Sequence, residues 1–364
     1  MSKLNIDSKL NPFFFMLVGL WFSSSALKVF FNSNVYINSP ENYESILNSL
    51  FWISGFIIVI LRFFLVKFTI DSNLKLVLAT IVCSLINLNI LAFSFSLLIW
   101  NAIATVIKPK QFIILYSVIL LCLIFSFMAS VSFYGQTYFN DPRYGNVETF
   151  GFMNSNSFPQ LLIIFFLISA MTPKLSVPLA VILYFSFKGS VETRTFYFLL
   201  VLYPLTQMCF SIIRAKIISS IPIVLFLFCI FLGMIYPYAK TPLILLIDSM
   251  LSYRISFGSI MLSALSPSEF LFGASRNTFE SLTIPMDMSY ISVVFKYGLL
   301  SSIILMCLYT KAIKKMYVDK SFQVMALVIA FLMYALVENV LISYYLNPTL
   351  YFLFYFCSIK KIQI

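Results

Sequence analysis

Long apolar runs, separated by short polar or basic segments, recur along the whole chain and limit what it can fold into. A run of about 17–25 apolar residues is long enough to cross a bilayer as a helix. Only 10% of the residues are charged and 61% are hydrophobic, whereas soluble domains have about 25% charged and 45–50% apolar residues. The sequence therefore predicts an all-α, polytopic integral membrane protein.

The spacing of these runs predicts a single transmembrane domain, residues 1–364, with about twelve helices (range ten to twelve). Lys3 and Lys9 precede the first run, which is interpreted as an uncleaved first helix. The range arises from three pairs of short spans, within 74–107, 158–188 and 322–358, some of which could be counted as one helix instead of two. The expected spans are 12–31, 46–66, two short spans within 74–107 that divide near Asn87–Asn89, 111–132, 158–173, 175–188, 195–213, 217–238, 288–310, 322–342 and 345–358.

Basic residues predict the orientation of these spans, because cytoplasmic loops are enriched in lysine and arginine. With both termini in the cytoplasm, every predicted inner segment has at least one such residue. The inner segments then contain 16 of the 24 basic residues. The net charge of +11 is thus explained by topology, and it does not indicate nucleic-acid binding.

Two predicted external segments stand out by length. One is 133–157, and the other is the large loop 239–287, which contains semi-apolar pieces such as LILLIDSMLSYRIS. The inner loops are short and basic. This asymmetry favours work at the external leaflet on a substrate that arrives with the lipid, whereas most transporters keep their polar groups near the midplane.

Some kinds of chemistry have no residues to support them. The chain contains no histidine, which removes the commonest general base and the commonest transition-metal ligand. The sequence has no cysteine–histidine cluster, no glycine-rich phosphate loop and no aspartate-rich metal motif. We therefore expect a site without a metal or other cofactor.

Arginines on the predicted outer side need an explanation, because the charge rule disfavours them there. They are Arg143, Arg194, Arg254 and Arg276. A guanidinium presents a planar fork of donors that fits phosphate oxygens, so an external site for a lipid diphosphate would use several. The alternative is pairing with nearby acids, for instance Arg194 with Glu192. Arg143 could pair with Asp141 in the same way.

Three other polar residues are candidates for the same site. Asn154 and Asn156 precede a predicted span and could present amides to sugar hydroxyls; the alternative is capping of the helix start. Glu338 lies in the outer part of the predicted span 322–342, where a carboxylate is costly and so marks a functional site by default. The alternative is an interfacial glutamate beside Asn339.

Four segments, in order, resemble the O-antigen and capsular polysaccharide polymerases (Wzy-type), a group related to the O-antigen ligases. They are GFMNSN before a span, VETRTFYFLL with its arginine before the next span, RISFGSIMLSALSPSEFLFGAS in the large loop, and PMDMSYISVVFKYGLL. Each motif is short, and their order carries the resemblance, which covers most of the chain. Some relatives, the ligases especially, have a functional histidine in the large loop, which is missing here.

The resemblance implies glycosyl transfer at the outer leaflet of a bacterial cytoplasmic membrane. A glycan on undecaprenyl diphosphate is transferred to a lipid-linked repeat unit, and the diphosphate leaves. Arg194 and Arg254, with Arg276 third, would stabilise the leaving group, and Arg143 is a further substrate-binding candidate. Candidate bases are Glu192, Asp287 and Glu338, in no order. The resemblance also implies a chain-length regulator and a flippase as candidate partner proteins.

Two alternatives stay open. One is an O-antigen ligase of the same group. The other is a flippase or other transporter of lipid-linked oligosaccharide, although such proteins usually have two similar halves and short external loops. The sequence does not name the sugars, the linkage, the anomeric outcome or the oligomeric state.

Overall fold

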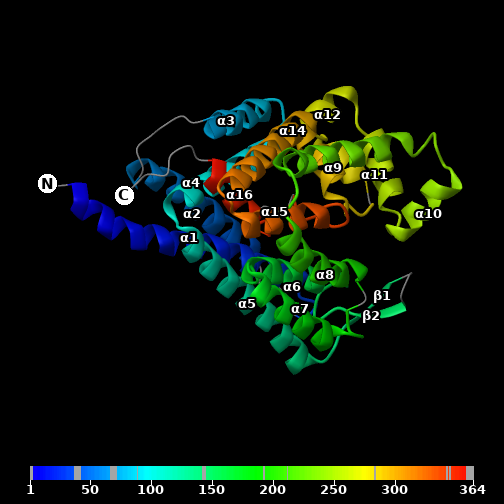
Figure 1. The fold of residues 1–364 in the computed structure, drawn as a ribbon, viewed down its shortest axis with the longest axis horizontal. Helices are drawn as coiled ribbons and strands as arrows, with labels where there is room; N and C mark the ends of the chain where they lie inside the picture. The colour runs from blue at the N-terminus through cyan, green and yellow to red at the C-terminus, as the bar shows by residue number, and fades with distance from the viewer. Residues whose placement is uncertain are drawn as a thin grey trace. The chain divides into compact units, whose positions relative to one another are not determined.

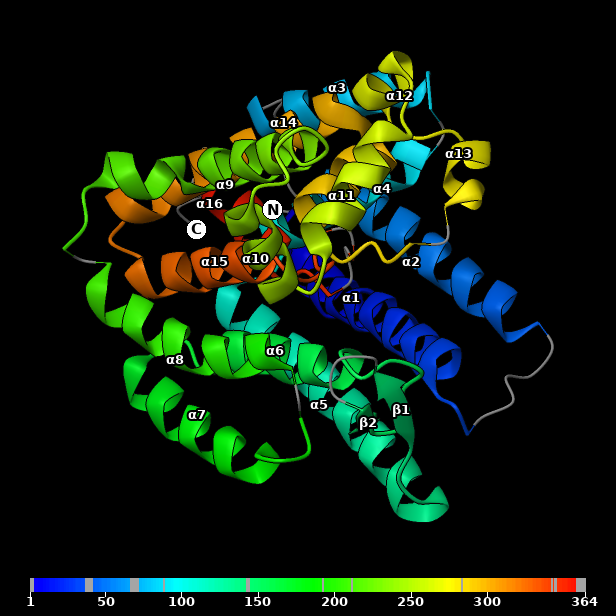
Figure 2. The same cartoon turned by 90° about the vertical axis from the view of Figure 1, so that its right-hand side faces the viewer.

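The computed structural model is predominantly helical, as predicted, and adds one short β-hairpin (Figures 1 and 2). It describes residues 3–36, 42–65, 72–87, 89–141, 145–191, 193–210, 212–282, 284–341, 343 and 346–357. The chain divides into two compact units. The first comprises Met1–Phe68 and Ala102–Cys209, and the second comprises Thr69–Asn101 and Phe210–Ile364.

Among the described residues, the first unit contains six helices and a hairpin. Helix α1 packs against α2 and α5, α5 packs against α6, and α6, α7 and α8 pack against one another. The elements are α1 (Lys3–Ser33), α2 (Tyr43–Leu65), α5 (Pro109–Tyr134), β1 (Tyr138–Asp141), β2 (Gly145–Glu148), α6 (Ser157–Ser169), α7 (Pro173–Phe187) and α8 (Arg194–Cys209).

Aromatic side chains fill the contact between α1 and its neighbours. The Trp21 ring stacks on Phe51 of α2, with 5.2 Å between the ring centroids. Phe22 meets the edge of Tyr116 of α5 at the same separation. Edge and offset aromatic pairs contribute about 0.5–1.5 kcal/mol beyond the area they bury, so these rings help to fix the helices to one another.

The hairpin lies in the predicted external segment 133–157. Strands β1 and β2 pair antiparallel, with Tyr138 opposite Glu148. The chain then returns to the end of α1, where Asn34 forms a β-bridge with Phe152 and donates to the Ser130 hydroxyl over 3.0 Å. The segment is thereby tied to α1 and α5.

The second unit is built around one long helix. Helix α14 packs against α3, α9, α11, α12, α15 and α16, and Figures 1 and 2 show it beside α9. The elements are α3 (Ser72–Ser84), α4 (Asn89–Val106, which runs past the end of the unit), α9 (Ala215–Ile235), α10 (Pro242–Met250), α11 (Arg254–Ser263), α12 (Pro267–Phe272), α13 (Arg276–Ser281), α14 (Ser289–Val318), α15 (Phe322–Tyr334) and α16 (Thr349–Cys357).

A kink in α14 receives the end of α12. Gly298 has φ 80° and ψ 163° inside the helix, a conformation that only glycine adopts without strain. A Cβ atom at Gly298 would lie 2.3 Å from the Leu271 carbonyl oxygen, and one at Gly273 would lie 2.5 Å from the Lys296 carbonyl oxygen. Two glycines thus allow the backbones of the large loop and of α14 to touch.

Polar side chains lock the same loop. The Asn87 amide donates to the carbonyl oxygens of residues 272, 273 and 274 over 3.0–3.2 Å. Glu269 accepts bonds from the backbone and hydroxyl of Ser266, the backbone of Ser275 and the hydroxyl of Thr278. These bonds hold the pKa of Glu269 below its usual range, the Ser275 and Thr278 contributions being the largest.

Five described helices are long and apolar enough to cross a membrane, or six if the bent pair α10–α11 forms one span. They are the segment Asn11–Ser33 of α1, together with α2, α5, α9 and α14, and each overlaps an expected span. A multi-pass membrane protein is therefore supported, while the count of about twelve is not confirmed. The expected span 322–342 is shorter than predicted, because α15 ends at Tyr334.

Candidate functional site

A sharp corner between α10 and α11 places Arg254 at the first position of α11. The two helices are bent by 103°, and Ser252 and Tyr253 have positive φ angles of 59° and 63°. Such angles are strained for residues with side chains and need support from their surroundings. The Asp248 carboxylate, which is 1% exposed, supplies this support. Its Oδ1 accepts from the backbone N–H groups of Ile255 and residue 256 over 2.9 and 3.2 Å.

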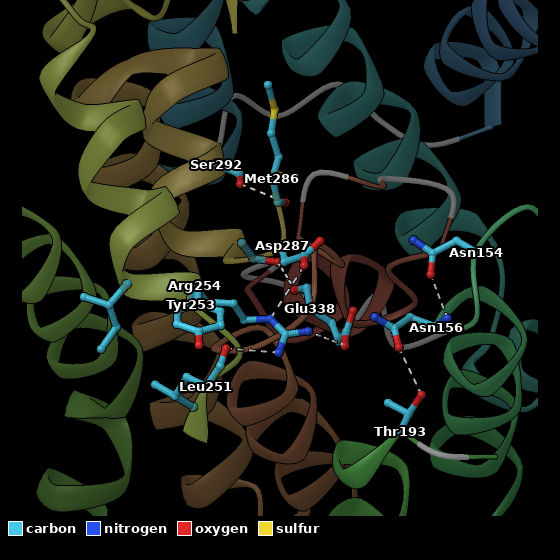
Figure 3. A network of polar contacts seen from close by, with 12 residues as sticks. Asn154, Asn156, Thr193, Leu251, Tyr253, Arg254, Met286, Asp287, Ser292 and Glu338 are labelled. Carbon is cyan, nitrogen blue, oxygen red and sulfur yellow. Dashed lines mark hydrogen bonds and ion pairs between the residues drawn. The ribbon is translucent and has the colours of Figure 1, made fainter. Parts of the chain in front are cut away.

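The Arg254 side chain is buried and faces two carboxylates. Its Nη2 donates to Glu338 Oε1 over 3.0 Å, and its Nη1 donates to the Leu251 carbonyl oxygen over 3.3 Å. Its Nε lies 3.9 Å from Asp287 Oδ2 and makes no hydrogen bond among the described residues. Figure 3 shows the guanidinium between these groups.

Glu338 reaches Arg254 from a non-helical turn that follows α15. Ser289, the first residue of α14, fastens this turn: its hydroxyl donates to the Glu338 carbonyl oxygen and accepts from the N–H groups of Val340 and Leu341 over 2.8 and 3.1 Å. The backbone N–H of Ser289 also donates to Ala335. Glu338 therefore lies beyond the helix in which the sequence placed it, in a position set by α14.

Asp287 approaches from the other side, two residues before α14 begins. The preceding carbonyl, that of Met286, accepts from the Ser292 hydroxyl over 3.1 Å, which fixes the approach to the helix (Figure 3). The Asp287 side chain is 38% exposed, against 5% for Glu338. One carboxylate of the cluster is thus accessible, while the other is enclosed with the arginine.

The charges of this cluster do not cancel. One guanidinium and two carboxylates give a formal charge of −1 when all are ionised. A buried arginine needs a partner, because removing one member of a buried ion pair leaves a charge that neither water nor protein compensates. Glu338 is suited to that task, and Asp287 is therefore the carboxylate available to another molecule.

In the first unit, the structure brings together Asn156 and the start of α8. The Asn156 side-chain oxygen accepts from the Thr193 hydroxyl over 3.0 Å, and the exposed Asn154 accepts from the backbone N–H of Asn156 over 2.8 Å. Figure 3 includes both bonds. Asn156 precedes α6, but its side chain does not cap that helix. Arg194, next to Thr193, is the exposed first residue of α8.

The other candidates are placed differently. Arg276 is 87% exposed and pairs with Glu280 one helical turn away, over 2.7 Å, so its environment is that of a surface ion pair. Glu192 and Arg143 lie outside the described residues.

No group of three or more histidine, cysteine, aspartate or glutamate side chains that could hold a metal ion occurs within the residues the structure describes. The candidate site in the second unit thus consists of one arginine and two carboxylates.

No family model, no curated protein and no solved structure matches this chain.

The sequence reasoning missed two residues that organise the site, Asp248 and Ser289. Asp248 carried a usable signal, since it is the sole charge in the apolar run LILLIDSM and a charge in such a run needs a partner. Ser289 carried none, because serine is common at helix starts and its contacts with 338–341 span about fifty residues of sequence.

Proposed function

We propose that this protein is a polysaccharide polymerase of a bacterial cytoplasmic membrane. It would transfer a glycan chain from undecaprenyl diphosphate to a lipid-linked repeat unit at the outer leaflet, as a metal-independent glycosyltransferase with both termini in the cytoplasm. The observation that carries the proposal is Arg254, buried against Glu338, with the accessible Asp287 beside it. The four ordered segments that resemble the polymerases add to it.

In the proposed reaction, a hydroxyl of the acceptor sugar attacks the anomeric carbon of the donor. The new carbon–oxygen bond forms as the bond to the diphosphate breaks, and the diphosphate leaves with the electron pair. Diphosphate is a good leaving group, so stabilising its negative charge matters more than protonating it. Arg254 would do this through its positive charge at close range, because its Nε is buried and makes no hydrogen bond among the described residues.

The proton of the attacking hydroxyl needs an acceptor. Asp287 is the favoured base because it is accessible and weakly held, at 3.9 Å from the arginine. Glu338 is committed to Arg254 at 3.0 Å and enclosed, so it would position the guanidinium. Asp287 would thus act on the acceptor sugar while Arg254 acts on the donor.

Arg194 and the two asparagines lie in the first unit and remain candidates for substrate contacts. Arg194 remains a candidate for the diphosphate because it is exposed at a helix start, where the helix dipole favours anions. Asn154 and Asn156 remain candidates for sugar hydroxyls. Arg276 is the weakest of the arginine candidates, because Glu280 already neutralises it at the surface.

The first test is deletion of the gene in its host, with the surface polysaccharide sized on a gel. A polymerase predicts a collapse from long polymer to single repeat units. Loss of all surface glycan would favour a flippase, and long polymer that stays on its lipid carrier would indicate a ligase.

Complementation then tests the site. Arg254→Lys keeps the charge but loses the planar fork, so the polymer should shorten while the protein stays in the membrane. Arg254→Ala and Arg194→Ala should abolish chain extension. Polymer of wild-type length in all three strains would remove both arginines from the reaction.

A further inference from the structure

Helix α10 exposes apolar side chains where a loop in water would expose polar ones. Leu243, Leu246, Ile247 and Met250 are between 38% and 66% exposed. Their spacing of i, i+3, i+4 and i+7 places them on one face of a helix. The sole buried residue of α10 is Asp248. The helix therefore turns its carboxylate toward the protein and an apolar stripe away from it, and Leu245 beside the stripe is also 45% exposed.

The stripe has aromatic and basic residues at its two ends. Tyr238, which is 89% exposed, and Lys240 precede α10, and the exposed Tyr253 follows it. Tyrosine and lysine are enriched where a membrane meets water, because a phenol or an ammonium group reaches the polar layer while the rest of the side chain contacts lipid.

The length of α10 excludes a crossing of the membrane by this helix alone. Nine residues extend about 13 Å at 1.5 Å per residue, against about 30 Å for the hydrocarbon core. Anchors at both ends of a short helix fit an element that lies along the interface, with its apolar face in the acyl chains. The 103° bend into α11 then lets the chain turn back into the packed helices (Figure 1).

We propose that α10 lies in the interfacial layer of the membrane, with Leu243, Leu246, Ile247 and Met250 buried among lipid acyl chains. The partner of this surface is thus the bilayer itself. This differs from the sequence prediction that all of 239–287 is an external loop. It also holds whether or not the protein is a polymerase.

An interfacial α10 also sets how deep the candidate site lies in the membrane. Arg254 follows Met250 by four residues, and Asp248 locks the corner between them through the backbone of 255 and 256. A helix anchored in the interface would therefore hold the guanidinium near the level of the lipid phosphates. A phosphate-bearing lipid could approach Arg254 without leaving the membrane.

Site-specific crosslinking in the full chain tests the proposal. A benzophenone amino acid is introduced at position 246, and the matched control is position 268, where the exposed Ser268 of α12 should face water. The protein is irradiated in nanodiscs of phosphatidylethanolamine and phosphatidylglycerol. We expect lipid adducts at 246 and few at 268. Adducts at 246 to a second protein or to another part of this chain would overturn the proposal.

A second measurement needs no bulky probe. Leu246→Cys and Ser268→Cys are treated in native membranes with a membrane-impermeant maleimide, with the wild-type protein as the baseline for the native cysteines. A thiol among acyl chains should react markedly more slowly than one in water, because the reactive thiolate forms poorly in apolar surroundings. Equal rates at the two positions would place α10 in water and refute the assignment.

Discussion

Arg254 Nη2 lies 3.0 Å from Glu338 Oε1, across 84 residues of sequence. Both side chains are almost fully enclosed, so the pair joins the start of α11 to the turn that follows α15. The contact favours the native arrangement of these two segments of the second unit, because either charge would be unpaired in the interior if they separated.

The pair should show strong coupling in stability. Glu338→Ala leaves Arg254 buried without its carboxylate and should lower the free energy of unfolding by about 3–5 kcal/mol. Glu338→Gln should cost less, because the amide oxygen can still accept the Nη2 hydrogen bond. Thermal unfolding of the single variants, and of Arg254→Ala with Glu338→Ala, checks this. Additive losses in the double variant would contradict a buried pair.

Asp287 should matter for reaction more than for folding. Asp287→Asn removes the accessible carboxylate and should lower the rate of chain extension by about 10²–10⁴-fold, with little change in melting temperature. The control is Asp319→Asn, which removes a carboxylate paired with Lys315 at the opposite end of α14. The rates are measured in proteoliposomes with a lipid-linked repeat unit. An unchanged rate for Asp287→Asn would eliminate it as the base.

The Ser289 hydroxyl should be needed to hold Glu338. Ser289→Ala leaves the N–H groups of Val340 and Leu341 without their acceptor, which should cost about 1–3 kcal/mol. Ser301, in the same helix, is a suitable control because its buried hydroxyl makes no hydrogen bond among the described residues. Thermal unfolding of Ser301→Ala should match the wild type. If Ser289→Ala lowered the free energy of unfolding no more than Ser301→Ala does, the Ser289 hydroxyl would not be needed to hold the turn.

The kink in α14 should not tolerate a side chain. Gly298→Ala places a Cβ 2.3 Å from the Leu271 carbonyl oxygen at a positive φ, so the large loop or the helix must move. We expect a destabilisation of about 1–3 kcal/mol or more from the strained backbone alone. Gly19→Ala is the control, since its Cβ would meet Leu115 at an ordinary 3.7 Å. A Gly298→Ala protein that melts like the wild type would argue against the close contact.

The Glu269 carboxylate should make the large loop sensitive to acid. Its pKa is lowered in the folded state, chiefly by hydrogen bonds from Ser275 and Thr278. A carboxylate with a lowered pKa stabilises the fold at pH values above its unfolded-state pKa, which is about 4.3 for glutamate. This stabilisation is lost as the pH falls toward the folded-state pKa. The stability difference between wild type and Glu269→Gln should therefore be largest near neutral pH and shrink below about pH 4. Hydrogen exchange of 266–282 across this pH range measures the stability difference. A difference that grows as the pH falls would contradict a lowered pKa of Glu269.

Much of the helical framework could be predicted from the sequence. The apolar runs near 12–31, 46–66, 111–132 and 217–238 each became a long apolar helix, because a run of that length has few ways to satisfy its backbone in lipid. The break near Asn87–Asn89 also appears, between α3 and α4. The sequence alone thus determined that the chain is helical and suited to a membrane, and it selected Arg254, Asp287 and Glu338 as residues that need an explanation.

The tertiary structure decided how those residues meet. The Ser289 clamp depends on contacts between segments about fifty residues apart. The corner depends on the Asp248 carboxylate folding back onto the backbone of 255 and 256. Hydrophobic periodicity describes one segment at a time and carries no information on such pairs. Only the folded chain could therefore separate an enclosed Glu338 from an accessible Asp287, because burial is a property of the assembled helices.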